Sequence, residues 1–143
     1  MINLSPYILF NGDCAEAMKF YQTCLGGELS ITTVGESPVK NQMPTNSHGK
    51  VVNARLHNAY FGLSASDWLH PTRSPVKGNT VCVYVNGGTY EELREIFTKL
   101  SQGADQSLLD PLQSLFFGTY GALTDKYGVR WMFQGESSTA NVK

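Results

Sequence analysis

Two stretches of equal length decide how this chain folds: DCAEAMKFYQTCLGG at residues 13–27 and TYEELREIFTKLSQG at residues 89–103. Each begins with a residue type that caps helix N-termini, has a glutamate three positions later, and ends at glycine. Apolar residues recur between these ends at helical spacing. They are Ala17, Tyr21, Cys24 and Leu25 in the first stretch, and Leu93, Ile96, Phe97 and Leu100 in the second. Both stretches are therefore predicted to be amphipathic helices, with capping boxes formed by Asp13 with Glu16 and by Thr89 with Glu92.

The two helical stretches belong to an internal repeat. Thr89 follows Asp13 by 76 positions, and Gly103 follows Gly27 by the same 76 positions. The offset also places residues 6–10 on residues 82–86, so a strand is expected before each helix. Further strands are predicted after each helix, at 28–34, 51–57 and 59–66 in the first half and at 104–109, 118–124 and 129–134 in the second. The order βαβββ thus occurs twice, and the predicted fold class is α+β, built from two similar modules.

The 143 residues are few enough to form one domain around one core. That domain is expected over residues 1–136, with module one at about 1–67 and module two at about 79–135. Residues 67–78, which contain Pro71 and Pro75, are expected to be a loop that joins the modules. The tail, residues 137–143, has too few apolar side chains to anchor it and is expected to be frayed.

Alternation along the strands assigns side chains to the two faces of each sheet. Three strands carry an apolar set, expected under a helix: Val52, Ala54 and Leu56; Val81, Val83 and Val85; Val129, Trp131 and Phe133. The opposite set in each strand mixes polar and aromatic residues: Asn53, Arg55 and His57; Thr80, Cys82 and Tyr84; Arg130, Met132 and Gln134. A mixed face meets either water or a ligand. Because two half-sheets of a duplicated unit can curl toward each other, we expect curved sheets whose mixed faces enclose a small-molecule cavity.

Composition excludes several classes of partner. A formal net charge of -1 leaves no basic excess for binding nucleic acid. No apolar run is long enough to span a membrane and no secretion signal is evident, so a cytoplasmic protein is expected. The three cysteines have no CxxC spacing, which argues against a disulfide framework and a structural zinc site. Cys14 leaves two interpretations open, a reactive thiolate favoured by the helix dipole or a small residue that fills the first turn.

Several motifs resemble those of one known family. They are Ser5-Pro6-Tyr7, Phe10-Asn11-Gly12, Phe20-Tyr21 with Leu25-Gly26-Gly27, Ser66-Asp67, and above all the run TDKYGVRWM at residues 124–132. With them the chain resembles the vicinal oxygen chelate superfamily (glyoxalase, bleomycin resistance, dioxygenase), specifically its PhnB-like branch. The resemblance implies paired βαβββ modules around a cavity, a small-molecule partner and a homodimer.

The resemblance also implies where a metal site would be expected. In the metalloenzymes of the superfamily, His, Gln or Glu at four strand positions hold a divalent ion. Those positions correspond here to Pro6, Thr80 and Met132, with the fourth near Gly62 or Ser64. None of these residues supplies a carboxylate or an imidazole, and His57 on the same face has no partner ligand of this kind. We therefore expect no bound metal and no cofactor.

The expected ligand-binding residues combine the mixed faces with aromatic residues near them. They are Phe10, Asn53, Arg55, His57, Thr80, Tyr84, Phe117, Arg130 and Met132. Arg55 and Arg130 are the candidates for binding a carboxylate or phosphate, because a guanidinium can hold either group with two hydrogen bonds. A metal-free small-molecule binding protein fits these residues best.

Two further functions stay open. One is a metal-dependent lyase, isomerase or dioxygenase of the vicinal oxygen chelate type. The other is a metal-free enzyme that uses Arg55, His57 or Tyr84. No GxSxG, HExxH or glycine-rich phosphate loop is present to identify a reaction. Metal content would separate the first alternative from a binding protein, and turnover of a ligand would separate the second.

Overall fold

The computed structural model describes residues 1–137 and contains two compact units, one ending at Val76 and the other beginning at Lys77. Each unit is one module, and each has the element order strand, helix and three strands. This order confirms the α+β fold of two βαβββ modules that the internal repeat predicts. Of the tail expected to be frayed, residues 138–143 lie outside the described residues.

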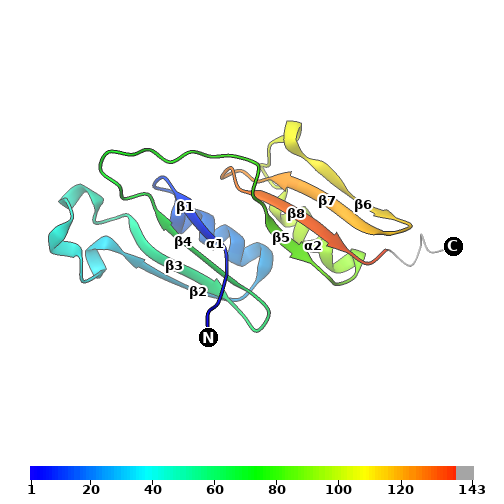
Figure 1. Cartoon of the computed structure of the whole chain (residues 1–143), viewed down its shortest axis with the longest axis horizontal. Helices are drawn as coiled ribbons and strands as arrows, with labels where there is room; N and C mark the ends of the chain where they lie inside the picture. Colours follow the sequence, from blue (N-terminus) through cyan, green and yellow to red (C-terminus); the bar gives the residue numbers. More distant parts are fainter. Residues whose placement is uncertain (138–143) are drawn as a thin grey trace. The chain divides into compact units, whose positions relative to one another are not determined.

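Module one is a four-stranded sheet with one long helix. Its elements are β1 (Tyr7–Phe10), α1 (Cys14–Leu25), β2 (Glu28–Thr33), β3 (Val51–His57) and β4 (Gly62–Asp67), with the short turns η1 (Val34–Glu36), η2 (Lys40–Gln42) and η3 (Thr45–Ser47) before β3. The strand order is β1-β4-β3-β2, in which β1 and β4 run parallel and the other neighbours antiparallel (Figure 1).

Module two repeats this topology. Its elements are β5 (Val83–Asn86), α2 (Tyr90–Leu100), η4 (Gln106–Leu108), β6 (Asp110–Leu115), β7 (Gly118–Thr124) and β8 (Arg130–Gly135). The strand order is β5-β8-β7-β6, again with one parallel pair, between β5 and β8. The same order and the same single parallel pair in both sheets are what a duplicated unit produces.

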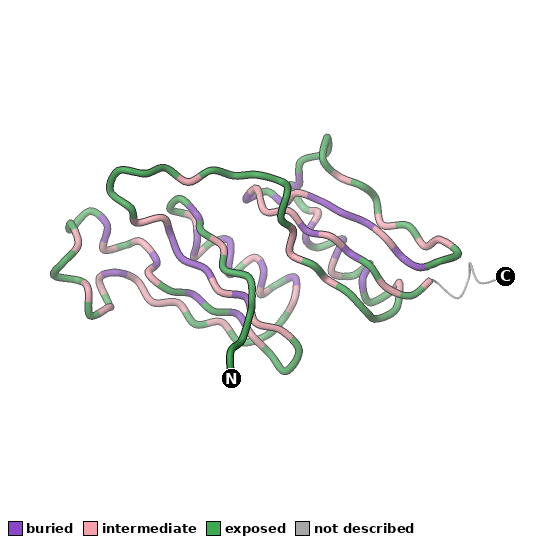
Figure 2. Tube along the Cα trace, viewed as in Figure 1, coloured by how far each residue is buried: buried purple, intermediate pink, exposed green. Residues whose placement is uncertain are grey.

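Each helix covers one face of its own sheet. Figure 2 shows buried stretches on the helix and on the strands of each module. In module one, Met18 and Tyr21 of α1 are fully buried together with Ala54 and Leu56 of β3 and with Phe10 of β1. In module two, α2 buries Leu93, Phe97 and Leu100, and β8 buries Trp131 and Phe133. The rings of Phe97 and Phe133 meet edge to face with centroids 5.1 Å apart. Burial of side chains of this size stabilises each module by about 1.5–3 kcal/mol per residue.

The two helices begin in different ways. The predicted box of Thr89 and Glu92 is confirmed: the Thr89 hydroxyl accepts the Glu92 N–H, and the Glu92 carboxylate accepts the Thr89 N–H. The predicted box of Asp13 and Glu16 is wrong, because the Asp13 side chain makes no capping bond.

A carboxylate distant in the sequence replaces that first box. Asp67, at the end of β4 and 3% exposed, accepts the N–H groups of Gly12 at 2.8 Å and Cys14 at 3.1 Å through Oδ1. Its Oδ2 accepts the Val51 N–H at 2.8 Å. One buried carboxylate therefore joins the start of α1 to the start of β3.

Three strand predictions need correction. The strand expected at 104–109 lies at Asp110–Leu115, because Asp105 accepts the Ser107 N–H and begins the turn η4 instead. Pro111 fits within β6 because β6 is an edge strand. Val81, expected under a helix, is 84% exposed and precedes β5. A bulge between Thr32 and Thr33 buries Val51, while Val52 stays half-exposed.

The run TDKYGV contains the turn between β7 and β8, in which Gly128 has a φ of +86°. The buried carboxylate of Asp125 accepts the N–H groups of Tyr127 and Val129 and the indole N–H of Trp131. No helix in the described part of the chain is long and apolar enough to cross a membrane.

Candidate functional site

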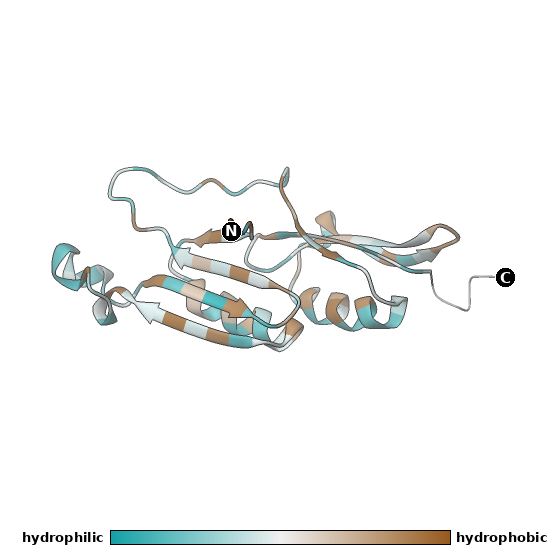
Figure 3. Ribbon diagram, turned by 60° about the horizontal axis from the view of Figure 1, so that its bottom comes forward, coloured by the Kyte–Doolittle hydropathy of each residue, from teal (hydrophilic) through white to brown (hydrophobic). Residues whose placement is uncertain are grey.

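The candidate site is built on the face of each sheet that its helix does not cover. Figure 3 shows the alternation that creates this face as bands of brown and teal along the strands of the first sheet. We call the uncovered faces the outer face of module one and the outer face of module two. Residues paired across neighbouring strands share a face, so the strand register defines which side chains lie together.

On the outer face of module one, a single row crosses all four strands. Arg55 of β3 pairs with Ser30 of β2 on one side and with Ser64 of β4 on the other, and Ser64 pairs with Tyr7 of β1. The row therefore presents a guanidinium between two hydroxyl groups, with a phenol at the edge. The expected ligand-binding residues did not include Ser30, Ser64 or Tyr7, although Ser64 is near the fourth expected metal position. The polar alternation of Glu28, Ser30 and Thr32 is a signal that could have identified Ser30.

Arg55 is the central cation of this row and is exposed. Among the described residues it makes no hydrogen bond and no ion pair. Its guanidinium lies over β4, because a Cβ atom placed on Gly62 would be only 3.1 Å from Nη2 of Arg55. The absence of a side chain at Gly62 thus leaves room for a guanidinium whose hydrogen-bonding groups remain available to a ligand.

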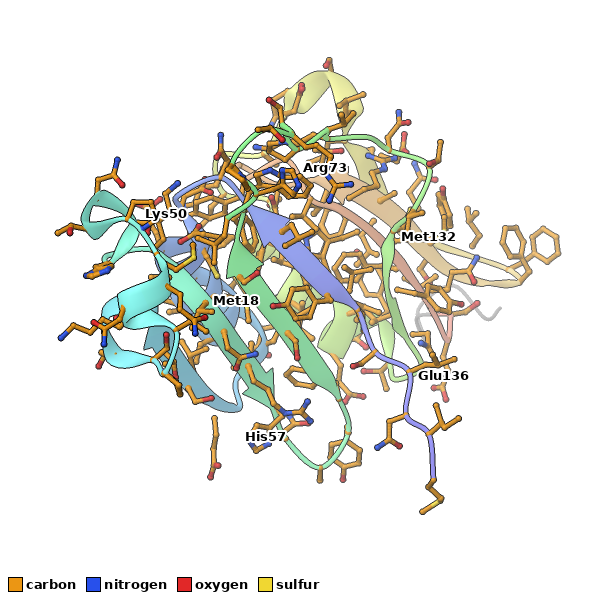
Figure 4. All side chains as sticks on the ribbon, turned by 60° about the vertical axis from the view of Figure 1, so that its left-hand side comes forward. Met18, Lys50, His57, Arg73, Met132 and Glu136 are labelled. Carbon is orange, nitrogen blue, oxygen red and sulfur yellow. The ribbon has the colours of Figure 1, made fainter. Side chains whose placement is uncertain are left out.

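His57 and Asn53 lie on the same strand and the same face as Arg55. His57 is at the end of β3 (Figure 4), where its Nε2 is 3.9 Å from Oε2 of Glu28. The Glu28 side chain is 87% exposed and the His57 side chain 42%, so this contact is weak. Asn53 is exposed and pairs with Thr32 of β2. Arg55, His57 and Asn53 are thus three of the expected ligand-binding residues that lie together on one surface.

The other two histidines hold loops. Nε2 of His48 is 2.9 Å from the carbonyl oxygen of Lys40, and Nδ1 of His70 accepts the Arg73 N–H at 2.9 Å. Neither belongs to β1–β4, so His57 is the histidine of the outer face.

On the outer face of module two, Arg130 and Tyr84 already have hydrogen-bond partners within the module. Arg130 of β8 forms an ion pair with Asp110 of β6 at 3.1 Å and donates to the Leu108 carbonyl and the Thr124 hydroxyl. Its side chain is only 17% exposed. The Tyr84 hydroxyl donates to Oε1 of Gln134 at 2.5 Å. Arg130 therefore secures the irregular start of the edge strand β6 and offers little to a ligand.

The remaining expected residues are separated by the strand pattern. Met132 pairs with Tyr84 and shares its face. Thr80 is exposed but precedes β5, so it is not on the sheet. Phe117 is 70% exposed in the turn between β6 and β7, where its ring meets that of Phe116.

Two expectations are corrected by burial. Phe10 lies on the covered face of module one, 1% exposed, with its ring 6.3 Å from that of Tyr21. Its place in β1 gives it the opposite face from Tyr7, so it belongs to the core and not to a ligand surface. Burial, together with the carboxylates of Asp67 and Asp13, raises the pKa of the Cys14 thiol to about 12. The alternative of a reactive thiolate is therefore wrong, and Cys14 is a small buried residue.

The residues at the expected metal positions do not fit a divalent ion. Pro6 and Thr80 precede their strands, while Gly62, Ser64 and Met132 lie on the outer faces without a carboxylate or imidazole. Within residues 1–137, no three His, Cys, Asp or Glu side chains come together as a metal site. The donor set thus disagrees with the metal chemistry of the superfamily's metalloenzymes.

Known proteins match this chain over nearly its whole length. A family model described as 3-demethylubiquinone-9 3-methyltransferase matches residues 3–134. Protein PA1353 from Pseudomonas aeruginosa is 32% identical, with a TM-score of 0.82 over 95% of this chain and 98% of that one. Protein YjdN from Escherichia coli K12 is 28% identical over 139 residues, which is 90% of this chain and 92% of YjdN.

A third relative carries the name of the branch. The protein from Bacillus cereus described as a putative 3-demethylubiquinone-9 3-methyltransferase, PhnB protein, is 25% identical, with a TM-score of 0.70 over 94% of this chain and 99% of that one. Structures described as glyoxalase/bleomycin resistance protein/dioxygenase share the fold at 13% and 15% identity. The chain therefore belongs to the 3-demethylubiquinone-9 3-methyltransferase family, which agrees with its resemblance to PhnB-like proteins.

Proposed function

We propose that this protein binds a small anionic molecule on the outer face of module one, with Arg55 as the anion-binding residue. Membership of the PhnB-like family supports a small-molecule-binding protein. The observation that carries the choice of site is the difference between the two arginines: Arg130 is paired with Asp110, whereas Arg55 is exposed and unpaired among the described residues.

The chemistry of the row suits an oxyanion. A guanidinium can hold two oxygens of a carboxylate or phosphonate in parallel hydrogen bonds. Ser30 and Ser64 are on the neighbouring strands, about 4.8 Å away on either side, and can donate to an oxygen placed over Arg55. Asn53 and His57 add polar groups along β3. A charge-assisted hydrogen bond of this kind contributes about 1.5–3 kcal/mol.

The test compares the loss of Arg55 with the loss of another exposed arginine, Arg94. Propionate and methylphosphonate serve as probes in chemical-shift titrations of the labelled protein. We expect Arg55→Met to weaken binding of at least one probe by about tenfold to a hundredfold, the equivalent of that energy. The control is Arg94→Met, at an exposed position of α2. Equal affinities for Arg55→Met and the unchanged protein would disprove the proposal.

A metal-dependent lyase, isomerase or dioxygenase is the first alternative function. We propose that the protein works without a divalent metal, because Pro6, Thr80 and Met132 stand at the ligand positions of the superfamily. Elemental analysis after soaking in zinc, iron, nickel and manganese tests this. One tightly held ion per chain would contradict it and favour the metalloenzyme.

A metal-free enzyme is the second alternative. His57 supplies the imidazole of the outer face of module one, and imidazole is the side-chain group that most often acts as a general acid or base. The name of the matched family supports testing methyl transfer among the candidate reactions. Turnover of a bound acid, lost in His57→Gln with binding unchanged, would favour an enzyme over a binding protein.

We further propose a cytoplasmic homodimer. The edge strands of each four-stranded sheet leave backbone groups to be covered, which supports association of two copies. Cys14 is a buried thiol, which suits a reducing compartment. Light scattering at micromolar concentration tests the dimer, and a monomeric mass would contradict it. The shared cavity and the single domain over residues 1–136 stay predictions, and the continuous family match over residues 3–134 supports the latter.

A further inference from the structure

The edge strand β1 adds an apolar surface to the anion-binding row. Tyr7 and Leu9 are 52% and 47% exposed, although their neighbours Ile8 and Phe10 in the same strand turn toward the helix. Tyr7 pairs with Ser64 and Leu9 with Ser66, so both lie on the outer face of module one. Two large apolar side chains two residues apart on one face form a continuous patch, and such patches mark binding surfaces more often than single exposed residues do.

The cation of the row extends across β4, the strand next to β1. The guanidinium of Arg55 lies over Gly62 of β4, and β4 is the direct neighbour of β1. Neighbouring strands are about 4.8 Å apart, and residues on one face repeat about every 6.8 Å along a strand. A group over Gly62 is therefore roughly 8 Å from Tyr7, which is the span of a small organic acid.

The distribution of charge on the outer face of module one also favours an acid group at Arg55 and an apolar group near β1. Glu28 is the carboxylate on the outer face of module one, and it lies on β2, at the edge opposite β1. Nothing negative on β1 or β4 faces Arg55 from the side of the patch, where the outer-facing residues are Tyr7, Leu9, Gly62, Ser64 and Ser66. The surface thus has a positive group at one point and an apolar group about 8 Å away.

We propose that the ligand of this site is a small carboxylic acid that carries an aromatic ring, with the acid group on Arg55 and Ser64 and the ring on Tyr7 and Leu9. The inference rests on the proposed function and adds the class of ligand. A tyrosine ring and a leucine side chain offer a flat apolar contact to the ring of a ligand. Aromatic rings in contact attract each other beyond the effect of buried area. Inorganic anions and short acids would contact only the guanidinium of Arg55 and not the apolar patch.

The test uses two acids that differ only in the ring, 3-phenylpropionate and propionate, titrated into the labelled full-length protein. We expect 3-phenylpropionate to bind at least tenfold more tightly than propionate. Tyr7→Ala should lower the affinity for 3-phenylpropionate at least fivefold and leave the affinity for propionate unchanged. Tyr7→Phe keeps the ring and should bind both acids as the unchanged protein does. The spectrum of each variant without ligand shows whether it is folded.

The arginine variant separates the two proposals. Arg55→Met should weaken both acids at least tenfold. If both acids bind with equal affinity and both depend on Arg55, the aromatic acid is ruled out while the anion site stands. If the affinity of 3-phenylpropionate depends on Tyr7 but neither acid depends on Arg55, the proposed function fails and this inference fails with it.

Discussion

The buried carboxylate of Asp67 makes the most direct test of how module one is held together. Its two oxygens accept three backbone N–H groups, from Gly12, Cys14 and Val51, at 2.8–3.1 Å. Asp67→Asn keeps the shape of the side chain but replaces one oxygen with an NH₂ group. If the remaining oxygen stays with Gly12 and Cys14, the NH₂ group faces the N–H of Val51, and two donors oppose each other.

The expected cost follows from these contacts. Val51 is 1% exposed, so its N–H cannot turn to water, and an unsatisfied buried N–H costs about 1–3 kcal/mol. The two bonds that remain change from charge-assisted to neutral, which weakens each by about half. We therefore expect Asp67→Asn to lower the free energy of unfolding by about 2–4 kcal/mol, a large part of the stability of a typical domain.

Urea unfolding followed by circular dichroism measures this loss, and hydrogen exchange at the Val51 amide locates it. The matched control is Asp13→Asn, since Asp13 stands at the start of the same helix without a side-chain capping bond. We expect that control to cost less than about 1 kcal/mol, the contribution of a charge near a helix N-terminus. If Asp13→Asn costs as much as Asp67→Asn, or if Val51 keeps its protection in Asp67→Asn, the reasoning is refuted.

Three further predictions concern single side chains. At pH 8, iodoacetamide should alkylate half-exposed Cys82 and spare buried Cys14, and mass spectrometry distinguishes the two sites. The pKa of Cys14 rises from 9.0 to about 12 on folding, so the free energy of unfolding should fall as the pH rises between these values. The expected fall, measured by urea titration, is up to about 1.4 kcal/mol per pH unit. Arg130→Met should lower the free energy of unfolding by about 1–2 kcal/mol and Asp110→Asn by less than about 1 kcal/mol, measured by thermal unfolding. The difference is expected because the ion pair is partly exposed and Arg130 also donates to Leu108 and Thr124. Equal losses in the two variants would contradict this order. Gly62→Ala should displace the guanidinium of Arg55 and weaken propionate binding several-fold without loss of stability, and an unchanged affinity would show that Gly62 does not position it.

Most of the fold could be predicted because each helix and strand is specified by several residues, through apolar spacing, alternation and turn residues. The strand β7 and the strand β3 have the bounds that alternation predicts, and α1 and α2 lie between the residues expected at their ends. Two of the errors, the first capping box and the strand after the second helix, come from single polar side chains. Asp105 accepts the Ser107 N–H and turns residues 106–108 into η4, which shifts the next strand to Asp110–Leu115. Local propensity cannot weigh one such hydrogen bond against a strand.

The candidate site could be predicted in part. Alternation placed Asn53, Arg55 and His57 on one face of β3, as the structure has them. It could not show that Arg130 is bound to Asp110, 20 residues away, because the partner depends on how β6 is aligned against β7. It also could not place Tyr7 beside Ser64, since the register of a parallel pair is set by packing far from either residue.

The difference between the two modules follows from how many residues specify each property. The topology of a module rests on an apolar stripe, four strands and several turns, so it survives when single residues change, and both modules keep it. The state of a surface arginine rests on one or two partners. Asp110, the only charged partner that the described residues give Arg130, makes this arginine a tie between β8 and the edge strand β6. No acidic residue pairs with Arg55 across β2 or β4, where its partners are Ser30 and Ser64. Two copies of one scaffold can therefore differ in function through a single carboxylate.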